Sequence, residues 1–444
     1  MVVGAGWLFG QAMTIGGLYL SLMITGAGHA RALLGIEMLA SAWLWMSVRR
    51  GRFSALREGR TAGVGLKVLL AIIGTSLAAR LAIMVVAVGW VPIRGDDAIS
   101  IWLFKAKVIA SLDHMPTDPA GDFFLGGSNP RYPVFCSLMS AWLPLVTGEW
   151  DERLAVVPWP LCHASVVLLI AGTAWRRLGA GASWTLAYLV GSLPLAAVHV
   201  CRPGYADLML GAFLAGMVAY LMAWSETDRP GELIAALVLA VVAACMKREG
   251  PGMAGIAAAV MMGCSWRLVW GWTMGKRLAV AAGAGIAALA VMAVMDFTEQ
   301  REAAQAFGYR PEVWGALYRH VFEWSSFNHL FYLIAGGAGL AALRAVGWPR
   351  GLKPAARWTP AARWTPAARR GECVGLLVAA GLCGLVAGIF ALTPQARFAL
   401  NDQTPSRLFL QVAPAIVLVL GVGLGTTLGF GPAQGGGEER IGHV

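Results

Sequence analysis

Apolar stretches long enough to cross a lipid bilayer recur from one end of this 444-residue chain to the other, and they constrain its fold more than any other feature. A helix needs about 20 mostly apolar residues to cross a hydrocarbon core of roughly 30 Å. Only 13% of the residues are charged, against about a quarter in an average soluble chain. The sequence therefore predicts an all-α, polytopic transmembrane helical bundle that forms a single membrane domain.

We expect about twelve spans, with their ends placed to within about two to four residues. Two of them, 232–246 and 251–264, are short and flank the charged break 247–251, so each is either a full span or part of a broken one. Residues 1–24 lack the charged start and the cleavage site of a signal peptide, so we interpret them as part of the first span. The expected spans are 5–27, 31–48, 68–91, 153–175, 183–200, 206–224, 232–246, 251–264, 278–296, 330–348, 373–392 and 407–430.

Basic residues gather in short connections on one side of this layout, which by the positive-inside tendency is the cytoplasm. Both termini are expected there, whereas most acidic residues fall on the outer side. That side receives a loop at 92–152 with two juxtamembrane helices, one of them at 132–146 with Trp142 at headgroup depth, and a second loop at 297–329. A basic cytoplasmic loop at 349–372 carries ArgTrpThrProAlaAla twice in tandem. These loops explain the net charge of +11, so nucleic acid is not an expected partner.

An acidic pair, Asp96 and Asp97, opens the first outer loop directly after the third predicted span. If the residues after it are helical, Asp97, Ile101 and Lys105 recur at i, i+4 and i+8 and share one face. A carboxylate and an ammonium would then face one pocket at the membrane surface, where two adjacent carboxylates suit a general base. The alternative is that the pair only caps a helix.

Three further polar sites lie at the outer ends of predicted spans, where ionisable groups are costly and therefore often functional. They are Tyr205 with Asp207, Lys247 with Arg248 and Glu249, and Arg407. Each site has an alternative interpretation: an ordinary polar turn at Tyr205 and Asp207, and a structural ion pair of Lys247 or Arg248 with Glu249. For Arg407, the alternative is a side chain that extends to the membrane interface. Cations and carboxylates at one surface suit a phosphate-bearing lipid together with a hydroxyl to be deprotonated.

Metal and cofactor motifs are weak. His320 and His329 flank Glu323 in the second outer loop, but their spacing matches no strong metal motif, and a role at the protein surface is the favoured interpretation. The seven cysteines include no CxxC pair, so neither a zinc site nor a disulfide framework is predicted. No phosphate-binding glycine loop or Ser-His-Asp signature stands out.

The order of the polar motifs resembles bacterial C-type (GT-C) membrane glycosyltransferases, the group that includes protein O-mannosyltransferases and the lipid A aminoarabinose transferase. The resemblance covers about residues 68–411, although two extra helices precede the acidic pair. Lys-Arg-Glu-Gly also stands where a single lysine is more usual, which leaves Lys247 and Arg248 as alternatives. The matching segments are Asp96-Asp97, Trp102, Lys105-Ala106-Lys107, Asn129-Pro130-Arg131-Tyr132-Pro133, Gly148-Glu149-Trp150-Asp151-Glu152-Arg153, Arg176-Arg177, Gly204-Tyr205-Ala206-Asp207, Lys247-Arg248-Glu249-Gly250 and Arg407.

The resemblance implies a hexosyl or pentosyl transferase in the bacterial plasma (inner) membrane. It would move a sugar, with inversion, from a polyprenyl-phosphate donor to an acceptor hydroxyl on the non-cytoplasmic face. Asp97, or as a second choice Asp96, is the implied catalytic base. The implied contacts of the donor phosphate are Lys105, Lys247, Arg248 and Arg407, and the implied cavity-lining residues are Trp102, Arg131, Tyr132, Tyr205, Asp207 and Glu249.

The acceptor can be a lipid, a glycan or a protein. The motifs identify no cofactor, and a divalent cation stays open. A non-enzymatic transporter or flippase of lipid-linked saccharides is the alternative function. Such proteins usually carry ionisable groups near the bilayer midplane and paired internal repeats. In this sequence most charges fall at the outer edge and the two halves show no repeat, which favours the enzyme.

Overall fold

A computed structural model describes residues 2–25, 30–33, 64–116, 132–271, 273–275, 308–323, 325–327, 330–332, 366–401 and 405–427, with a few isolated positions between them. Within these residues the regular structure is entirely helical, as predicted. The described helices are α1 (Val2–Ile24), α3 (Val64–Trp90), α4 (Leu103–Leu112), α5 (Phe135–Thr147), α6 (Glu152–Ala155), α7 (Pro158–Leu178), α8 (Ala180–Gly191), α9 (Pro194–Cys201), α10 (Asp207–Thr227), α11 (Pro230–Met246), α12 (Gly250–Gly271), α15 (Val313–Tyr318), α17 (Pro366–Leu392), α18 (Ala396–Leu400) and α19 (Pro405–Thr427). Two π-helical turns, η1 (Ala98–Trp102) and η3 (Arg319–Glu323), and a 3-10 turn, η4 (Ser325–Phe327), complete the set.

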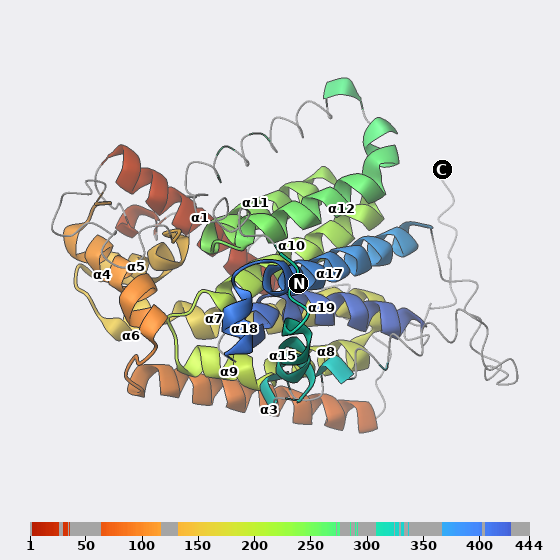
Figure 1. The fold of residues 1–444 in the computed structure, drawn as a ribbon, viewed down its shortest axis with the longest axis horizontal. Helices are drawn as coiled ribbons and strands as arrows, with labels where there is room; N and C mark the ends of the chain where they lie inside the picture. The colour runs from red at the N-terminus through yellow and green to blue at the C-terminus, as the bar shows by residue number, and fades with distance from the viewer. Residues whose placement is uncertain are drawn as a thin grey trace, which may run out of the picture.

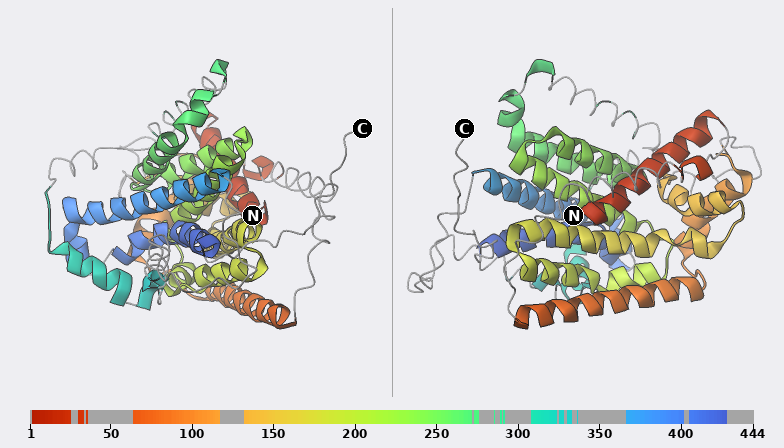
Figure 2. Two further views of the ribbon diagram at one scale, coloured as in Figure 1. Left: turned by 90° about the vertical axis from the view of Figure 1, so that its right-hand side faces the viewer. Right: turned by 180° about the vertical axis from the view of Figure 1, so that it is seen from behind.

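The long helices run side by side as a bundle with α10 at its centre (Figure 1). Helix α10 packs against α7, α11, α17 and α19, and 94% of its most apolar stretch is buried in the protein, against 11% for α3. Helix α3 lies along one edge of the bundle in every view (Figure 2). An apolar helix that exposes most of its side chains is expected of a lipid-facing span, whereas α10 forms the core.

Five helices in the described part of the chain are long and apolar enough to span a membrane, or six if the bent pair α8 and α9 is one span. Four shorter apolar helices accompany them, among them α5 and α11. The predicted spans at 31–48, 278–296 and 330–348 lie almost wholly outside the described residues, so the total of about twelve stays a prediction. The chain is a helical membrane protein.

The predicted span at 183–200 is not one continuous helix. It consists of α8 and α9, which are bent by 55° at the break between them. Pro194 begins α9, and Leu193 before it has an extended ψ of 119°, because the proline ring disfavours the helical conformation of the preceding residue. The bend brings the chain to the polar turn that precedes α10.

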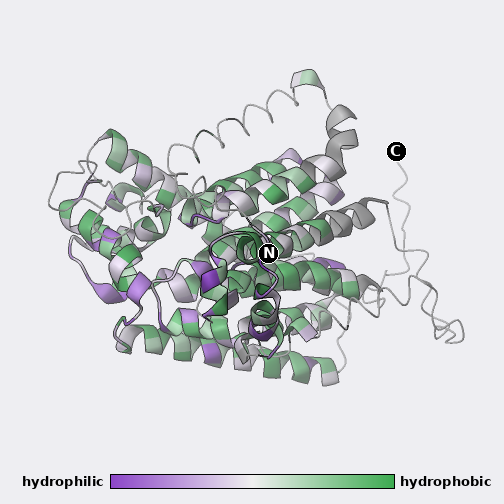
Figure 3. Ribbon diagram, in the orientation of Figure 1, coloured by the Kyte–Doolittle hydropathy of each residue, from purple (hydrophilic) through white to green (hydrophobic). Residues whose placement is uncertain are grey.

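The described residues between α3 and α7 form η1, α4, α5 and α6, which gather at one end of the bundle (Figure 1). Helix α5 has 13 residues and so is only about 20 Å long, too short for a span, as expected. We predicted that Trp142 on α5 faces the lipid headgroups, but it is 6% exposed and therefore buried in the protein. The long helices are mostly hydrophobic, and hydrophilic residues are more frequent among these short helices and connections (Figure 3).

The far ends of α7 and α10 are joined by a bidentate ion pair. Arg177 donates from Nε to one carboxylate oxygen of Glu226 at 2.9 Å and from Nη2 to the other at 2.8 Å. Parallel hydrogen bonds of this kind fix both the distance and the orientation of two helices. Most of the tandem repeat at 357–369 lies outside the described residues.

Candidate active site

Asp207 is the first residue of α10, and its side chain is fully buried. Its Oδ1 accepts hydrogen bonds from Lys247 Nζ at 2.7 Å and from Gln411 Nε2 at 2.6 Å. Its Oδ2 faces Arg407, whose Nε lies at 3.1 Å and Nη2 at 3.0 Å. A buried carboxylate needs such partners, and the start of a helix favours negative charge. Asp207 therefore ties α10 to the break after α11 and to α19.

Arg407, near the start of α19, is shared between two carboxylates. Besides Asp207, its Nη2 lies 2.7 Å from Oδ2 of Asp97. The centre of its guanidinium lies 4.4 Å from the ring centroid of Tyr205, a distance at which a cation is attracted to an aromatic face. Arg407 is thus directed into the protein rather than out to the interface, and it brings Asp97 into the same network as Asp207.

The break between α11 and α12 carries Lys247 in an extended conformation, with φ −154° and ψ 160°. This conformation directs the ammonium at Asp207, while Glu249 Oε1 lies 3.7 Å from the same Nζ. Gly250 then allows the chain to turn closely against α11, because a Cβ there would overlap the carbonyl oxygen of Ala243. The charged interruption of the hydrophobic hairpin thus contributes directly to the Asp207 cluster.

Tyr132 is the centre of a second group of predicted residues. Its ring lies edge-on to Trp102, with centroids 5.2 Å apart, and the Arg248 guanidinium lies 3.8 Å above it. Its carbonyl oxygen accepts a hydrogen bond from Lys105 Nζ at 2.8 Å. Since Arg248 directly follows Lys247 in the chain, this aromatic group adjoins the Asp207 cluster.

Lys105 is fully buried in α4. Burial lowers its pKa to about 8, and the nearby charge of Arg248 acts in the same direction. A buried ammonium with a pKa near 8 exchanges its charge close to neutral pH. Lys105 is therefore a cation whose charge depends on pH in the physiological range.

Tyr205 occupies the turn between α9 and α10. Its carbonyl oxygen accepts a hydrogen bond from Trp159 Nε1 at 3.0 Å, and its ring lies 5.3 Å from the ring of His199. Burial raises the pKa of its phenol, an effect that Arg407 partly opposes. The phenol stays protonated at neutral pH and keeps a hydroxyl beside the acidic pair.

Gly204 shapes this turn, with a left-handed φ of 108°. A Cβ there would overlap the side chain of Ala98, the residue after Asp97.

We expect Gly204→Ala to lower the free energy of unfolding by about 1–3 kcal/mol through overpacking and backbone strain. Thermal unfolding of the purified protein in detergent measures this loss of stability. Gly89→Ala is the control, because no atom lies within 4 Å of a Cβ at that position. Equal stability of the two variants would contradict the close packing of this turn.

The predicted site residues fall into two adjoining groups. The Asp207 cluster contains Asp97, Tyr205, Asp207, Lys247, Glu249 and Arg407. The aromatic group contains Trp102, Lys105, Tyr132 and Arg248. Asp96 contributes its carbonyl oxygen to a bond from Ser100, and Arg131 lies outside the described residues.

The predicted common face of Asp97 and Lys105 is wrong. Between them lies the π-helical turn η1, which widens the backbone repeat before α4 begins. Asp97 consequently binds Arg407, whereas Lys105 donates to Tyr132. The helix-cap alternative also fails for Asp97, because its side chain makes no capping hydrogen bond.

Gln411 and His320 carry contacts that the sequence analysis missed or misjudged. Gln411 lies four residues after Arg407, and this spacing on α19 could have indicated that both face Asp207. His320 is 1% exposed rather than at the surface, and its Nδ1 lies 2.7 Å from Ser406 Oγ. Among the described residues no group of three or more His, Cys, Asp or Glu side chains is arranged to hold a metal ion.

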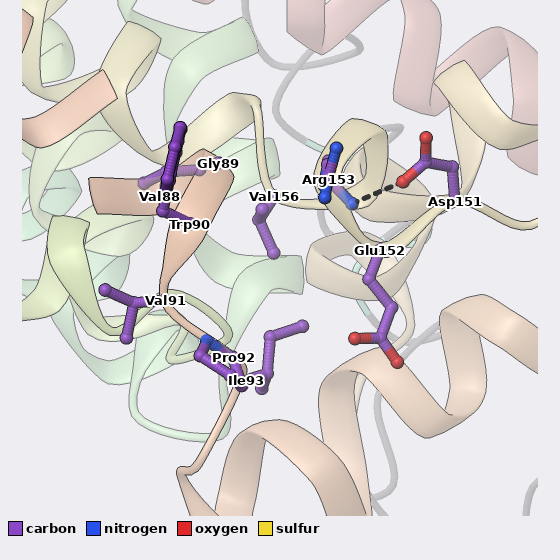
Figure 4. Close-up of a pocket in the computed structure, with 10 residues that line it drawn as sticks. All are labelled: Val88, Gly89, Trp90, Val91, Pro92, Ile93, Asp151, Glu152, Arg153 and Val156. Carbon is purple, nitrogen blue, oxygen red and sulfur yellow. Dashed lines mark hydrogen bonds between the residues drawn. The ribbon is translucent and has the colours of Figure 1, made fainter. Parts of the chain in front are cut away.

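A cavity of about 260 Å³ lies between the end of α3 and the start of α6 (Figure 4). Its walls include Trp90, Ile93 and Glu152. Asp151 there caps α6, since its Oδ1 accepts a hydrogen bond from the backbone nitrogen of Arg153 at 2.8 Å. The predicted site residues that the structure describes are not part of its walls.

No family model matches the chain, and no curated protein matches its sequence. Among solved structures, the chain is similar to the crystal structure of ArnT from Cupriavidus metallidurans bound to undecaprenyl phosphate. The TM-score is 0.42 at 14% sequence identity, over 83% of this chain and 78% of that chain.

Proposed function

We propose that this chain is a glycosyltransferase that moves a sugar from a polyprenyl-phosphate donor to an acceptor hydroxyl, with inversion at the anomeric carbon. The observation that carries the proposal is the guanidinium of Arg407, which is salt-bridged to both Asp97 and Asp207. It connects a carboxylate that is 38% exposed to the fully buried carboxylate of Asp207. Sugar transfer from a lipid phosphate requires both parts, a base within reach of the acceptor and cations for the leaving group.

In the proposed reaction, the acceptor oxygen attacks the anomeric carbon while Asp97 accepts the hydroxyl proton. The bond between the anomeric carbon and the phosphate oxygen breaks, and its electron pair stays on the phosphate. Lys247 and Arg407, oriented by Asp207, stabilise the negative charge that develops there, because fixed charges in a water-poor site act without reorganisation. Arg248 and the buried Lys105, which both contact Tyr132, add further positive charge beside these two cations.

We further propose that this site faces the outside of a bacterial plasma membrane, with both chain termini in the cytoplasm. Support comes from the basic connections at the opposite ends of the spans, such as Arg176 and Arg177 at the end of α7. A lipid-linked donor reaches its enzyme from the bilayer, so a site at the end of the helices suits it.

Depletion of the protein tests the proposal. We expect a polyprenyl-phosphate-linked sugar to accumulate in the membrane, and its identity names the donor. The purified protein added to that lipid together with an envelope extract should release free polyprenyl phosphate and glycosylate a component of the extract. No accumulation and no release of polyprenyl phosphate would refute the proposal.

The same assay separates the enzyme from a transporter or flippase of lipid-linked saccharides. A flippase moves the donor between leaflets and leaves the bond between sugar and phosphate intact. Movement of the donor without release of polyprenyl phosphate would therefore favour the transporter.

The affinity for undecaprenyl phosphate should fall as the pH rises from about 7.5 to 9 if Lys105 binds the phosphate. Its ammonium is charged below its pKa of about 8 and neutral above it, and loss of one coupled proton weakens binding by at most about tenfold per pH unit. Phosphate monoesters have already lost their second proton in this range, with a pKa of about 6. Titration calorimetry in detergent micelles gives the dissociation constants.

Two variants are the controls for this pH dependence. Lys105→Arg should flatten it because arginine stays charged, and Lys105→Gln should bind weakly at every pH. A pH dependence unchanged in both variants would exclude Lys105 as its source.

A further inference from the structure

The two carboxylates that share Arg407 differ in how firmly they are held. Asp207 is fully buried and also binds Lys247 and Gln411. Asp97 is 38% exposed, and within the described part of the chain Arg407 is its salt-bridge partner. Exposed ion pairs contribute little, whereas removal of one member of a buried network is costly. The bond to Asp97 is therefore the replaceable one.

The guanidinium itself has a fixed place. Its Nε and Nη2 are bonded to Asp207, and its plane lies near the ring of Tyr205. Asp96 and Asp97 form a short helical stretch between the non-helical residues 92–95 and the π-helical turn η1. A rotation of the Asp97 side chain is enough to break its contact, without movement of any helix. An incoming anion thus meets an oriented guanidinium, whose planar geometry matches a phosphate group.

We propose that Asp97 and the phosphate of the lipid donor compete for Arg407, so that donor binding releases the Asp97 carboxylate to accept the acceptor proton. This inference rests on the proposed function and names a regulation of the same site. While Asp97 is bonded to Arg407, one of its oxygens is engaged by a charge-assisted hydrogen bond and has less capacity to accept a proton. When the phosphate takes that position, the carboxylate is freed beside the anomeric carbon.

An ordered reaction follows from this competition. The donor has to bind before the acceptor hydroxyl can be deprotonated, because the base becomes available only in the donor complex. The phosphate that replaces Asp97 on the guanidinium is the group that leaves in the reaction. The same contact therefore couples donor recognition to activation of the base.

Binding of undecaprenyl phosphate to the purified full chain, without acceptor, tests the competition. Asp97→Asn keeps the size of the side chain and removes the competing charge, so its dissociation constant should be about tenfold lower than that of the unaltered protein. Asp96→Asn removes the same charge one residue away, where no contact with Arg407 occurs in the described structure, and should change the constant less than about twofold. Thermal unfolding verifies that both variants are folded.

A second background makes the test specific to Arg407. In Arg407→Gln the contested guanidinium is absent, so the additional Asp97→Asn change should no longer increase affinity. A gain of the same size in both backgrounds, an equal gain from Asp96→Asn, or no gain from Asp97→Asn would each overturn the competition. Absence of any binding of undecaprenyl phosphate would overturn both the competition and the proposed function.

Transfer assays on the same variants separate the two ideas. Tighter lipid binding by Asp97→Asn with undiminished sugar transfer would support the competition and refute the base assignment. Lost transfer with unchanged lipid binding would support the base assignment and refute the competition.

Discussion

Asp97→Asn should lower the rate of sugar transfer by about 100-fold to 10,000-fold, the range that a general base contributes. An amide has the size of the carboxylate but does not accept the acceptor proton, so the chemical step loses its base. Asp97 is 38% exposed, and the substitution should leave the protein folded. The release of polyprenyl phosphate from the accumulated lipid-linked sugar measures the rate.

Asp96→Asn is the matched variant for this experiment. It removes the same charge from the same turn, and the carboxylate of Asp96 has no salt bridge to Arg407 in the described structure. We expect the rate of sugar transfer to decrease by less than about tenfold, because Asp96 would act only as a nearby charge and not as a reacting group. Near-normal transfer by Asp97→Asn with a large loss in Asp96→Asn would move the base to Asp96.

The spans were predictable because lipid imposes a simple rule on composition, a run of about 20 apolar residues. The predicted spans at 68–91 and 206–224 correspond to Val64–Trp90 and Asp207–Thr227, within a few residues at each end. The break before Pro194 was missed although the signal was local, since a proline displaces the preceding residue from the helix. Hydropathy averaged over a span hides such a break.

The site was only partly predictable, since contacts between distant segments depend on packing. The sequence showed that Asp97, Asp207 and Arg407 fall at helix ends on one side, but not that one guanidinium connects both carboxylates. The π-helical turn η1 changes the register between Asp97 and Lys105, and its irregular period is not visible in the residue pattern. His320 was misjudged because a polar residue in a connection gives no indication of whether it is buried.

Asp207→Ala should destabilise the protein by about 3–5 kcal/mol, the cost of leaving a buried charge without its partner. The substitution removes the acceptor of Lys247, Arg407 and Gln411 at once. Asp207→Asn keeps one acceptor oxygen for Lys247 but places an amide NH2 group, which is a donor, opposite Arg407. We therefore expect a loss of stability smaller than that of Asp207→Ala. Thermal unfolding in detergent gives the order of stabilities.

The pair at the opposite end of α10 is the control for this prediction. Arg177 and Glu226 are 11% and 24% exposed, whereas Asp207 is fully buried, so Glu226→Gln should cost less than either change at Asp207. The double variant Asp207→Asn with Lys247→Met should lose less stability than the sum of its single changes, because each single change leaves the other group buried and unpaired. Two results would mean that Asp207 does not hold the cations in place: additive losses in the double variant, or an Asp207→Ala variant as stable as Glu226→Gln. The site would then lack the fixed charges on which stabilisation of a leaving phosphate depends.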